Sequence, residues 1–435
     1  MKHNTLAQGL ILYLKDPLRK NSAFLMASHA VLGLLGFFFW AIAARTYDTE
    51  EVGLATALVS AVLLLHTLAR LGLDIGMIRF LPDAKDRSAM MNTCFTLVGV
   101  FAVVLALVFV LGVRTWSPAL KVVREEADYF VLFIVFAAGV SLVDVVRQGA
   151  FVALRRTEFS LLMEIIAGLR LPLLLVMVSL GAFGIFCSWG VASCVALIAG
   201  VLFIAKLERG YRPVPGVEKG VVGRVLHFSL GNYVAESLRE LPGFLLPLLV
   251  VNVLALDMSA YFYVAWTLAS VILMIAYATS FSLLAEVSRE PEKFGSDVVR
   301  AMKFILLLLV PAVLIVFLLG DRILSLFGAE YAENGADLLR LLTISGIPVA
   351  FNILYITWKR LRQEVWPIVY LYAFVAAFTI GVGYVLMEEM GLAGIGIAWL
   401  SANGMVTVLI GLAMLKRWIQ SGNTRSGQGK AERSI

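Results

Sequence analysis

Apolar residues in this chain gather into long runs that short polar segments separate. Each run is about 18 to 25 residues long, and a helix of that length spans a hydrocarbon core of roughly 30 Å. The pattern therefore predicts an all-α polytopic membrane protein with twelve transmembrane helices. The predicted spans are Ser22–Ala44, Val52–Leu73, Ser88–Val113, Tyr129–Ala153, Phe159–Leu180, Ile185–Lys206, Leu226–Leu254, Ala260–Leu284, Phe304–Gly320, Leu341–Trp358, Val365–Leu386 and Gly391–Leu415.

The loops between these runs carry Lys and Arg unevenly. If the N-terminus is cytoplasmic, 26 of the 36 basic residues fall in cytoplasmic segments and six in outer loops. Cytoplasmic loops of membrane proteins carry an excess of Lys and Arg. A missed or invented span in the middle of the chain would destroy this asymmetry. The charge pattern therefore favours an even number of spans with both termini in the cytoplasm.

The twelve runs divide into two sets of six that start on the same side, which predicts parallel repeats. The expected organisation has five parts. They are an amphipathic cytoplasmic N-terminal segment (residues 1–21), a first six-helix bundle (22–206), a cytoplasmic linker rich in glycine and proline (207–223), a second six-helix bundle (224–417) and a disordered cytoplasmic tail (418–435).

Composition narrows the class of function. The chain is 60% hydrophobic and 15% charged, whereas a soluble chain is about half apolar and a quarter charged. The net charge of +6 comes from scattered loop residues, so nucleic acid is not an expected partner. Cys94, Cys187 and Cys194 lie inside apolar runs and are expected to pack there. No motif for a metal, a cofactor or a catalytic nucleophile is present, so a transporter is expected rather than an enzyme.

Eight ionisable residues besides histidines fall within the spans. Each costs about 2.5–3.5 kcal/mol at a helix centre, so in contact with lipid the set would cost on the order of 20 kcal/mol. Most of these side chains must therefore face one another or a hydrated cavity. Arg70 lies near a span end and is expected to snorkel, and His29, His66 and His227 are expected to be packing or interfacial residues. The eight are Arg70, Asp144, Arg147, Glu164, Arg170, Glu236, Arg239 and Glu240.

The seventh span carries the strongest signal. Glu236, Arg239 and Glu240 share one helix face, with Asn232 one turn earlier, and Pro242 and Pro247 are expected to break the helix. Two ionised carboxylates four residues apart would repel, so one of them is expected to hold a proton. Either the two acids couple transport to an ion, or they only neutralise Arg170 and Arg239. The sequence leaves both interpretations open.

Several segments resemble a known family, the Wzx-type polysaccharide flippases, whose superfamily also holds the MATE exporters and the lipid II flippases. ARTYDTEEVGLATALVSAVLLLHTLARLGLDIGMIRFLPDA at Ala44–Ala84 is similar to the opening of these proteins. HFSLGNYVAESLRELPGFLLPLLVVNVL at His227–Leu254 and the segment Ala260–Glu290 resemble their seventh and eighth helices, and Leu326–Pro348 resembles the region around the tenth.

The resemblance implies a MATE-like arrangement of two six-helix bundles around a polar cavity. It implies transport of a polyprenyl-pyrophosphate-linked oligosaccharide to the outer leaflet of the cytoplasmic (inner) membrane, for surface polysaccharide biosynthesis. The expected partners are this substrate, membrane lipids, H⁺ or Na⁺, and a polysaccharide polymerase or glycosyltransferases. The alternative is a MATE-like, cation-coupled exporter of small cationic compounds, which the intramembrane acids favour.

Two groups of candidate residues follow from these considerations. Arginines of the cavity would hold the pyrophosphate and sugars, and carboxylates would couple transport to an ion. The cavity substrate-binding candidates are Arg147, Arg170, Arg239 and Asn232, and the ion-coupling candidates are Glu236, Glu240, Asp144 and Glu164.

Overall fold

A computed structural model describes residues 17–287 and 294–431, and every regular element in these two ranges is a helix. Most of the predicted N-terminal amphipathic segment lies outside these ranges. In the first half of the chain the elements are α2 (Pro17–Thr46), α3 (Thr49–Ala69), α4 (Leu73–Phe80), α5 (Arg87–Trp116), the 3₁₀ turn η1 (Pro118–Leu120), α6 (Val122–Glu125), α7 (Ala127–Asp144), the π-helix η2 (Val145–Ala150), α8 (Phe151–Ala153), α9 (Thr157–Ala167), α10 (Arg170–Val176), the 3₁₀ turn η3 (Val178–Leu180) and α11 (Gly181–Leu207).

The second half contains longer, less interrupted helices. They are α12 (Lys219–Val253), α13 (Leu256–Val287), α14 (Phe294–Ser325), α15 (Ala329–Ile344), α16 (Gly346–Leu361), α17 (Val365–Met390) and α18 (Leu392–Ala431). The structure describes residues 418–431, where the sequence predicts a disordered tail, as a continuation of α18.

Eleven helical segments of the described residues are long and apolar enough to cross a membrane. Each overlaps one of the predicted spans, so the chain is a multi-pass, all-α membrane protein. The predicted seventh span falls on α12, which is 35 residues long and is not among the eleven. Whether α12 completes a set of twelve stays a prediction.

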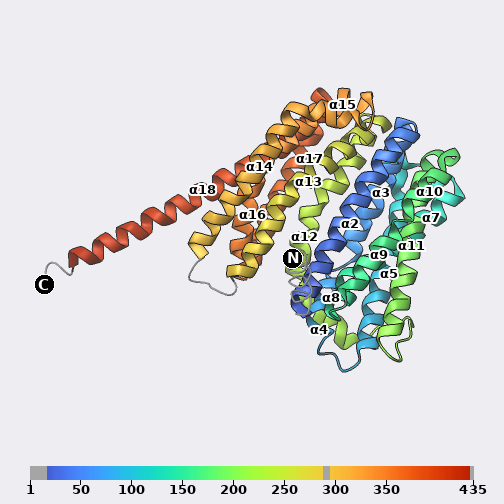
Figure 1. Ribbon diagram of the computed structural model, residues 1–435, viewed down its shortest axis with the longest axis horizontal. Coiled ribbons are helices and arrows are strands. Elements are labelled where there is room, and N and C mark those ends of the chain that lie inside the picture. The colour runs from blue at the N-terminus through green and yellow to red at the C-terminus, as the bar shows by residue number, and fades with distance from the viewer. Residues whose placement is uncertain (1–16, 288–293, 432–435) are drawn as a thin grey trace, which may run out of the picture. The chain divides into compact units, whose positions relative to one another are not determined.

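The contacts divide the chain into two compact units. The first holds Met1–Val264 together with Ser325–Tyr331, and the second holds Ala265–Leu324 and Ala332–Ile435. Helix α12 thus lies in the first unit, although the sequence assigns it to a second bundle that begins at residue 224. Figure 1 shows the helices of each unit running alongside one another. The division into two six-helix bundles stays a prediction.

Helix α12 packs closely against α3 and α4 because glycines face it. Leu71 and Gly72 take left-handed backbone conformations (φ 52° and 70°) and separate the two helices. A Cβ atom on Gly76 would lie 2.1 Å from Cγ1 of Val225 on α12. Only glycine permits α4 to lie so close to α12. The left-handed turn and this close packing together bring the end of α3 against the charged middle of α12.

The predicted linker is also part of the first unit. Its Tyr211 side chain is buried in an apolar cluster, and burial raises the pKa of this phenol to about 12. Asn92 donates a hydrogen bond to the carbonyl of Arg212 (2.9 Å), and the amide of Gly216 donates to Thr96 (3.1 Å). These contacts dock the linker along α5.

Two pairs of matched turns support the predicted parallel repeat. Arg155, after α8, and Gln363, after α16, have φ values of 56° and 58°, and the next residue in each case donates its amide to a carbonyl five residues earlier. Gly181 and Gly391 have nearly equal φ and ψ angles (58°, −139° and 59°, −141°). The same two helix-ending conformations therefore recur in both halves of the chain.

The expected break in the seventh span is wrong. Helix α12 runs from Lys219 to Val253 with Pro242 and Pro247 inside it. Proline removes one amide and disturbs one carbonyl, but neighbouring helices can satisfy the freed backbone group within a membrane. Ser259 adds a long hydrogen bond to α12 at this point, from its Oγ to the carbonyl of Pro247 itself (3.5 Å).

Candidate transport site

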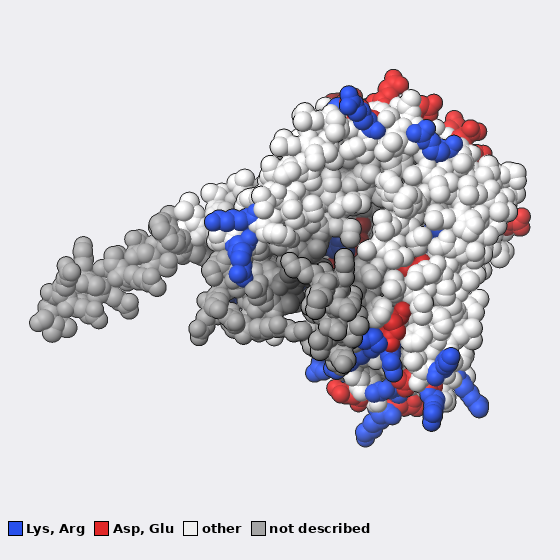
Figure 2. All heavy atoms as spheres, viewed as in Figure 1, with Lys and Arg blue, Asp and Glu red and all other residues white. Residues whose placement is uncertain are grey.

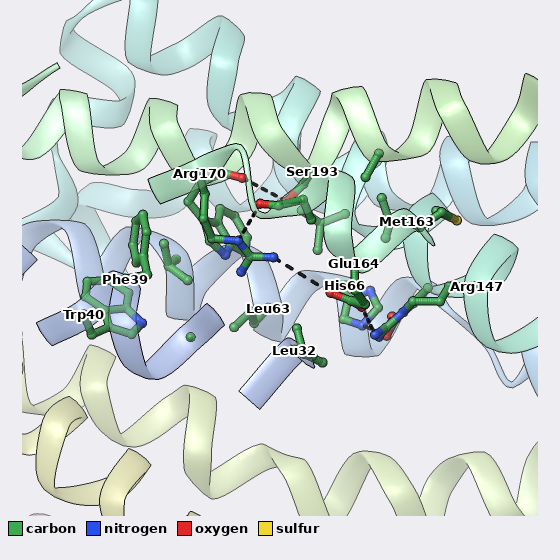
Figure 3. Close-up of a pocket in the computed structure, with 18 of the residues that line it drawn as sticks. Leu32, Phe39, Trp40, Leu63, His66, Arg147, Met163, Glu164, Arg170 and Ser193 are labelled. Carbon is green, nitrogen blue, oxygen red and sulfur yellow. Dashed lines mark hydrogen bonds and ion pairs between the residues drawn. The ribbon is translucent and has the colours of Figure 1, made fainter. Parts of the chain in front are cut away.

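A cavity of about 310 Å³ lies inside the first unit. Its apolar wall includes Phe39, Trp40, Leu63, Trp189 and Phe244, and its polar wall includes His66, Asp144, Arg147, Glu164, Arg170, Ser193, Glu240 and Tyr263. Figure 3 shows charged side chains from several helices converging on this space. A mostly apolar pocket with a few convergent polar groups is the usual form of a ligand site.

Arg147 reaches the cavity from an irregular stretch of helix. It lies in the π-helix η2, a conformation that occurs often at functional sites. Its side chain is buried and forms ion pairs with Asp144, three residues earlier, and with Glu164 of α9. Ser160 donates a hydrogen bond to the carbonyl of Arg147 (2.8 Å), which ties η2 to α9.

Arg170 enters from the interruption between α9 and α10. Pro172 cannot donate to the carbonyl four residues earlier, and the helix breaks at Gly168 and Leu169. The buried Arg170 side chain donates to the carbonyl of Ala167 (2.9 Å) and lies 4.0 Å from Glu164. Glu164 therefore contacts both Arg147 and Arg170, as the dashed lines in Figure 3 indicate.

The end of α3 supplies residues that the sequence interpretation did not place in the site. Arg70 donates to Glu240 of α12 (2.7 Å) and lies 3.6 Å from Asp74 and 4.0 Å from Asp144. His66 Nε2 lies 3.2 Å from Asp144 Oδ2. The expectation that Arg70 snorkels is therefore wrong, because its side chain is only 12% exposed and pairs with carboxylates instead. His66 is buried, as expected of a packing residue, and in addition contacts Asp144.

The charged face of α12 joins the same network. Arg239 donates to Glu236 (2.9 Å through Nε) and to Glu240 (3.1 Å), and Thr67 of α3 donates to Glu240 (3.2 Å). Both acids of the predicted protonation pair thus contact one arginine. Asn232, by contrast, is exposed and does not line the cavity.

Together these contacts form one continuous network of ion pairs, in which each charged side chain has a partner of opposite charge. It runs through Arg170, Glu164, Arg147, Asp144, Arg70, Glu240, Arg239 and Glu236, with Asp74 and His66 attached. Four arginines face five carboxylates. Because positive and negative charges nearly balance, these ionised side chains can stay inside a membrane-embedded unit.

The structure brings together seven of the eight predicted site residues and leaves out Asn232. The residues that were missed are Arg70, Asp74 and His66. A signal for them exists, because His66, Arg70 and Asp74 are ionisable residues that recur every four positions around the end of the predicted second span. Among the described residues there is no group of His, Cys, Asp and Glu side chains fit to hold a metal ion.

Residues 18–240 match the family described as polysaccharide biosynthesis protein. This range covers half of the chain and nearly all of the residues that line the cavity. The chain belongs to this family. The resemblance read from the sequence is therefore confirmed at the family level. No match is found among proteins of curated function.

Solved structures show that this member of the polysaccharide biosynthesis family has a MATE-like fold. An inward-facing multidrug-resistance MATE transporter of the MOP superfamily is similar with a TM-score of 0.65 and 17% identity, covering 91% of this chain and 98% of the transporter. The lipid II flippase MurJ, in an inward closed conformation, is similar with a TM-score of 0.72 and 12% identity, covering 91% and 87%. A MOP superfamily transporter from Pyrococcus furiosus, described as having a binding pocket of reverse polarity, gives 0.58 and 16%, covering 93% and 96%.

Proposed function

We propose that this protein flips a polyprenyl-pyrophosphate-linked oligosaccharide from the cytoplasmic to the outer leaflet of the inner membrane, for surface polysaccharide biosynthesis. The observation that carries the proposal is a cavity with buried arginines inside a multi-pass member of the polysaccharide biosynthesis family. The proposed topology has both termini in the cytoplasm. The proposed partners are membrane lipids and the polymerase or glycosyltransferases that make or use the same glycan.

The chemistry of the cavity suits a pyrophosphate. Guanidinium groups bind phosphate oxygens through paired N–H donors, and such charge-assisted bonds are strong where water is scarce. Arg147 and Arg170 line the cavity and are held in place by Glu164, while Arg239 belongs to the same network of ion pairs. The aromatic side chains Trp40, Trp189 and Tyr263 supply flat apolar surface that suits sugar rings.

Ion coupling is proposed at Asp144, Glu164, Glu236 and Glu240. Each of these acids contacts at least one arginine of the network, so a phosphate must compete with a carboxylate for the same guanidinium. A proton or Na⁺ that neutralises the carboxylate favours the exchange. Alternating access coupled to an ion gradient is therefore the proposed mode of transport.

The test is a deletion strain in which the protein is supplied in trans. Without the protein, lipid-linked oligosaccharide should accumulate in the cytoplasmic leaflet, where an added membrane-impermeant glycosidase cannot reach it. Wild-type protein should restore access, Arg147→Ala should not, and Arg79→Ala, whose side chain is 60% exposed outside the cavity, should restore access as wild type does. Surface glycan that persists in the deletion strain, with no second flippase present, would refute the proposal.

A MATE-like exporter of small cations is the second candidate, and the charge of the network favours it. Five carboxylates against four arginines leave a small excess of negative charge that a cation could satisfy. The two candidates separate in one assay. Energised vesicles that extrude a cationic dye in a Glu240-dependent manner support the exporter, and vesicles that translocate a short-chain pyrophosphate-linked sugar support the flippase.

A further inference from the structure

A second polar pocket lies at one end of the first unit, away from the charged cavity. It has a volume of about 320 Å³ and is lined by Pro82 after α4, Arg87 at the start of α5, Leu154–Arg156 between α8 and α9, and Glu208 after α11. Figure 2 shows Lys and Arg side chains gathered at this end of the unit, where Figure 1 places α4 and α8. The distribution of charge predicts that this end is cytoplasmic.

Positive charge dominates the pocket. Three arginines are among its lining residues, Arg87, Arg155 and Arg156, and Glu208 is the single acidic residue in the lining. The ion pairs here are long and partly exposed: Arg87–Glu208 is 3.3 Å and Arg156–Glu158 is 3.5 Å, with the arginines 43% and 52% exposed. Ion pairs of this kind contribute little, so both arginines can exchange partners easily.

Arg155 is the most informative of the three. Among the described residues its guanidinium has no ion-pair or hydrogen-bond partner, and its backbone is left-handed with φ of 56°. That conformation is unfavourable for any residue with a side chain, and glycine or asparagine would be favoured in its place. At the matched turn in the second half Gln363 has φ of 58°, so the turn itself does not require a positive charge.

We propose that Arg87, Arg155 and Arg156 form a phosphate-binding site at the membrane surface. The forked donors of three arginines around one pocket match the oxygens of a phosphate or pyrophosphate group, and basic pockets between transmembrane helices bind lipid headgroups. The phosphate can come from the polyprenyl-pyrophosphate carrier, from an anionic phospholipid or from solution. Only the first source rests on the proposed flippase function.

The experiment compares variants of the purified full-length protein in detergent. Arg155→Gln with Arg156→Gln removes two charges from the pocket, and glutamine is already accommodated at the matched turn. Arg79→Gln with Arg212→Gln removes two exposed charges outside the pocket and is the control. Arg155→Lys with Arg156→Lys keeps the charge but loses the forked donors. The probes are undecaprenyl pyrophosphate, phosphatidylglycerol and inorganic pyrophosphate, with affinity read by native mass spectrometry and thermophoresis.

The glutamine pair should weaken binding about tenfold or more for at least one probe, the lysine pair should weaken it less, and the control pair should bind as wild type does. The probe that loses affinity identifies the source of the phosphate. Unchanged affinity for all three probes, or an equal loss in the control pair, overturns the site. The wild-type protein could fail to restore translocation of the lipid-linked oligosaccharide in the deletion strain while binding still depends on Arg155 and Arg156. That result would refute the flippase proposal and leave the phosphate-binding site supported.

Discussion

At the scale of single residues, the charged network explains why so many ionisable side chains can stay inside the first unit. A buried charge is tolerated where its partner is close and hydrogen-bonded, and removal of one partner leaves the other uncompensated. Arg147 illustrates the point because it is buried and contacts two carboxylates on different helices. Its contribution is therefore larger than that of any exposed arginine.

Replacement of Arg147 by alanine should lower the free energy of unfolding by about 3–5 kcal/mol, because Asp144 and Glu164 lose their closest cation. Reversible unfolding in mixed micelles measures this change. The double variant Arg147→Ala/Glu164→Gln should recover part of the loss, since a neutral amide is less costly to bury than an unpaired carboxylate. A single variant as stable as wild type would show that the cavity is hydrated enough to solvate both acids.

At the scale of elements, the turn between α3 and α4 decides where α12 can lie. Gly72 should not tolerate alanine, because its φ is 70° and the new Cβ would meet Tyr233 Cβ at 2.8 Å and Ser229 Cβ at 3.0 Å. Strain in the left-handed region alone costs about 1–2 kcal/mol. Gly72→Ala should therefore lower the thermal midpoint, measured by dye-free scanning fluorimetry. Gly33→Ala, on α2 where a Cβ meets nothing within 4 Å, should change it little, and equal effects would contradict the packing argument.

The turn after α2 makes a second inter-element contact. Arg45 donates to the carbonyls of Leu326 (2.6 Å) and Ser325 (2.9 Å), and Glu330 accepts from Thr49 (2.9 Å) and from Tyr261 (3.1 Å). A cation at the C-terminus of a helix, here α14, satisfies carbonyls that have no partner within the helix. The segment Ser325–Tyr331 consequently lies in the first unit although the chain on both sides of it belongs to the second.

Arg45→Ala should release this segment. Hydrogen bonds to a charged group contribute about 1.5–3 kcal/mol, so amide exchange at Gly328–Tyr331 should become about tenfold faster or more. Hydrogen–deuterium exchange with mass spectrometry measures this directly. Arg114→Ala is the matched control, because Arg114 is an exposed arginine that pairs with Glu125 instead. Unchanged exchange in Arg45→Ala would show that the hydrogen bonds of Glu330 suffice to hold the segment.

At the scale of the whole molecule, the number of spans depends on α12. If α12 crosses the membrane, Pro215 before it and Ala255 after it lie on opposite sides. In a chain whose three native cysteines are replaced, Pro215→Cys should be protected from an impermeant maleimide in intact cells and Ala255→Cys should react. Reaction of both residues, or of neither, would contradict a transmembrane α12 and with it the count of twelve.

The sequence by itself determined the membrane class, the approximate positions of eleven spans and the family. Each of these follows from information that is local along the chain: apolar run length, charge in loops, and short motifs such as the one at Ala44–Ala84. It also singled out eight residues of the charged network, because a charge within an apolar run is costly wherever it falls.

Only the tertiary structure decided how those charges pair. Arg70 is placed near a span end, yet the left-handed turn at Leu71 and Gly72 and the close approach of α12 bring it to Glu240 at 2.7 Å. Asn232 lies one turn before Glu236 on the same side of α12, yet it is exposed and does not line the cavity. Which helix faces another depends on contacts between distant segments, and no spacing within one helix contains that information.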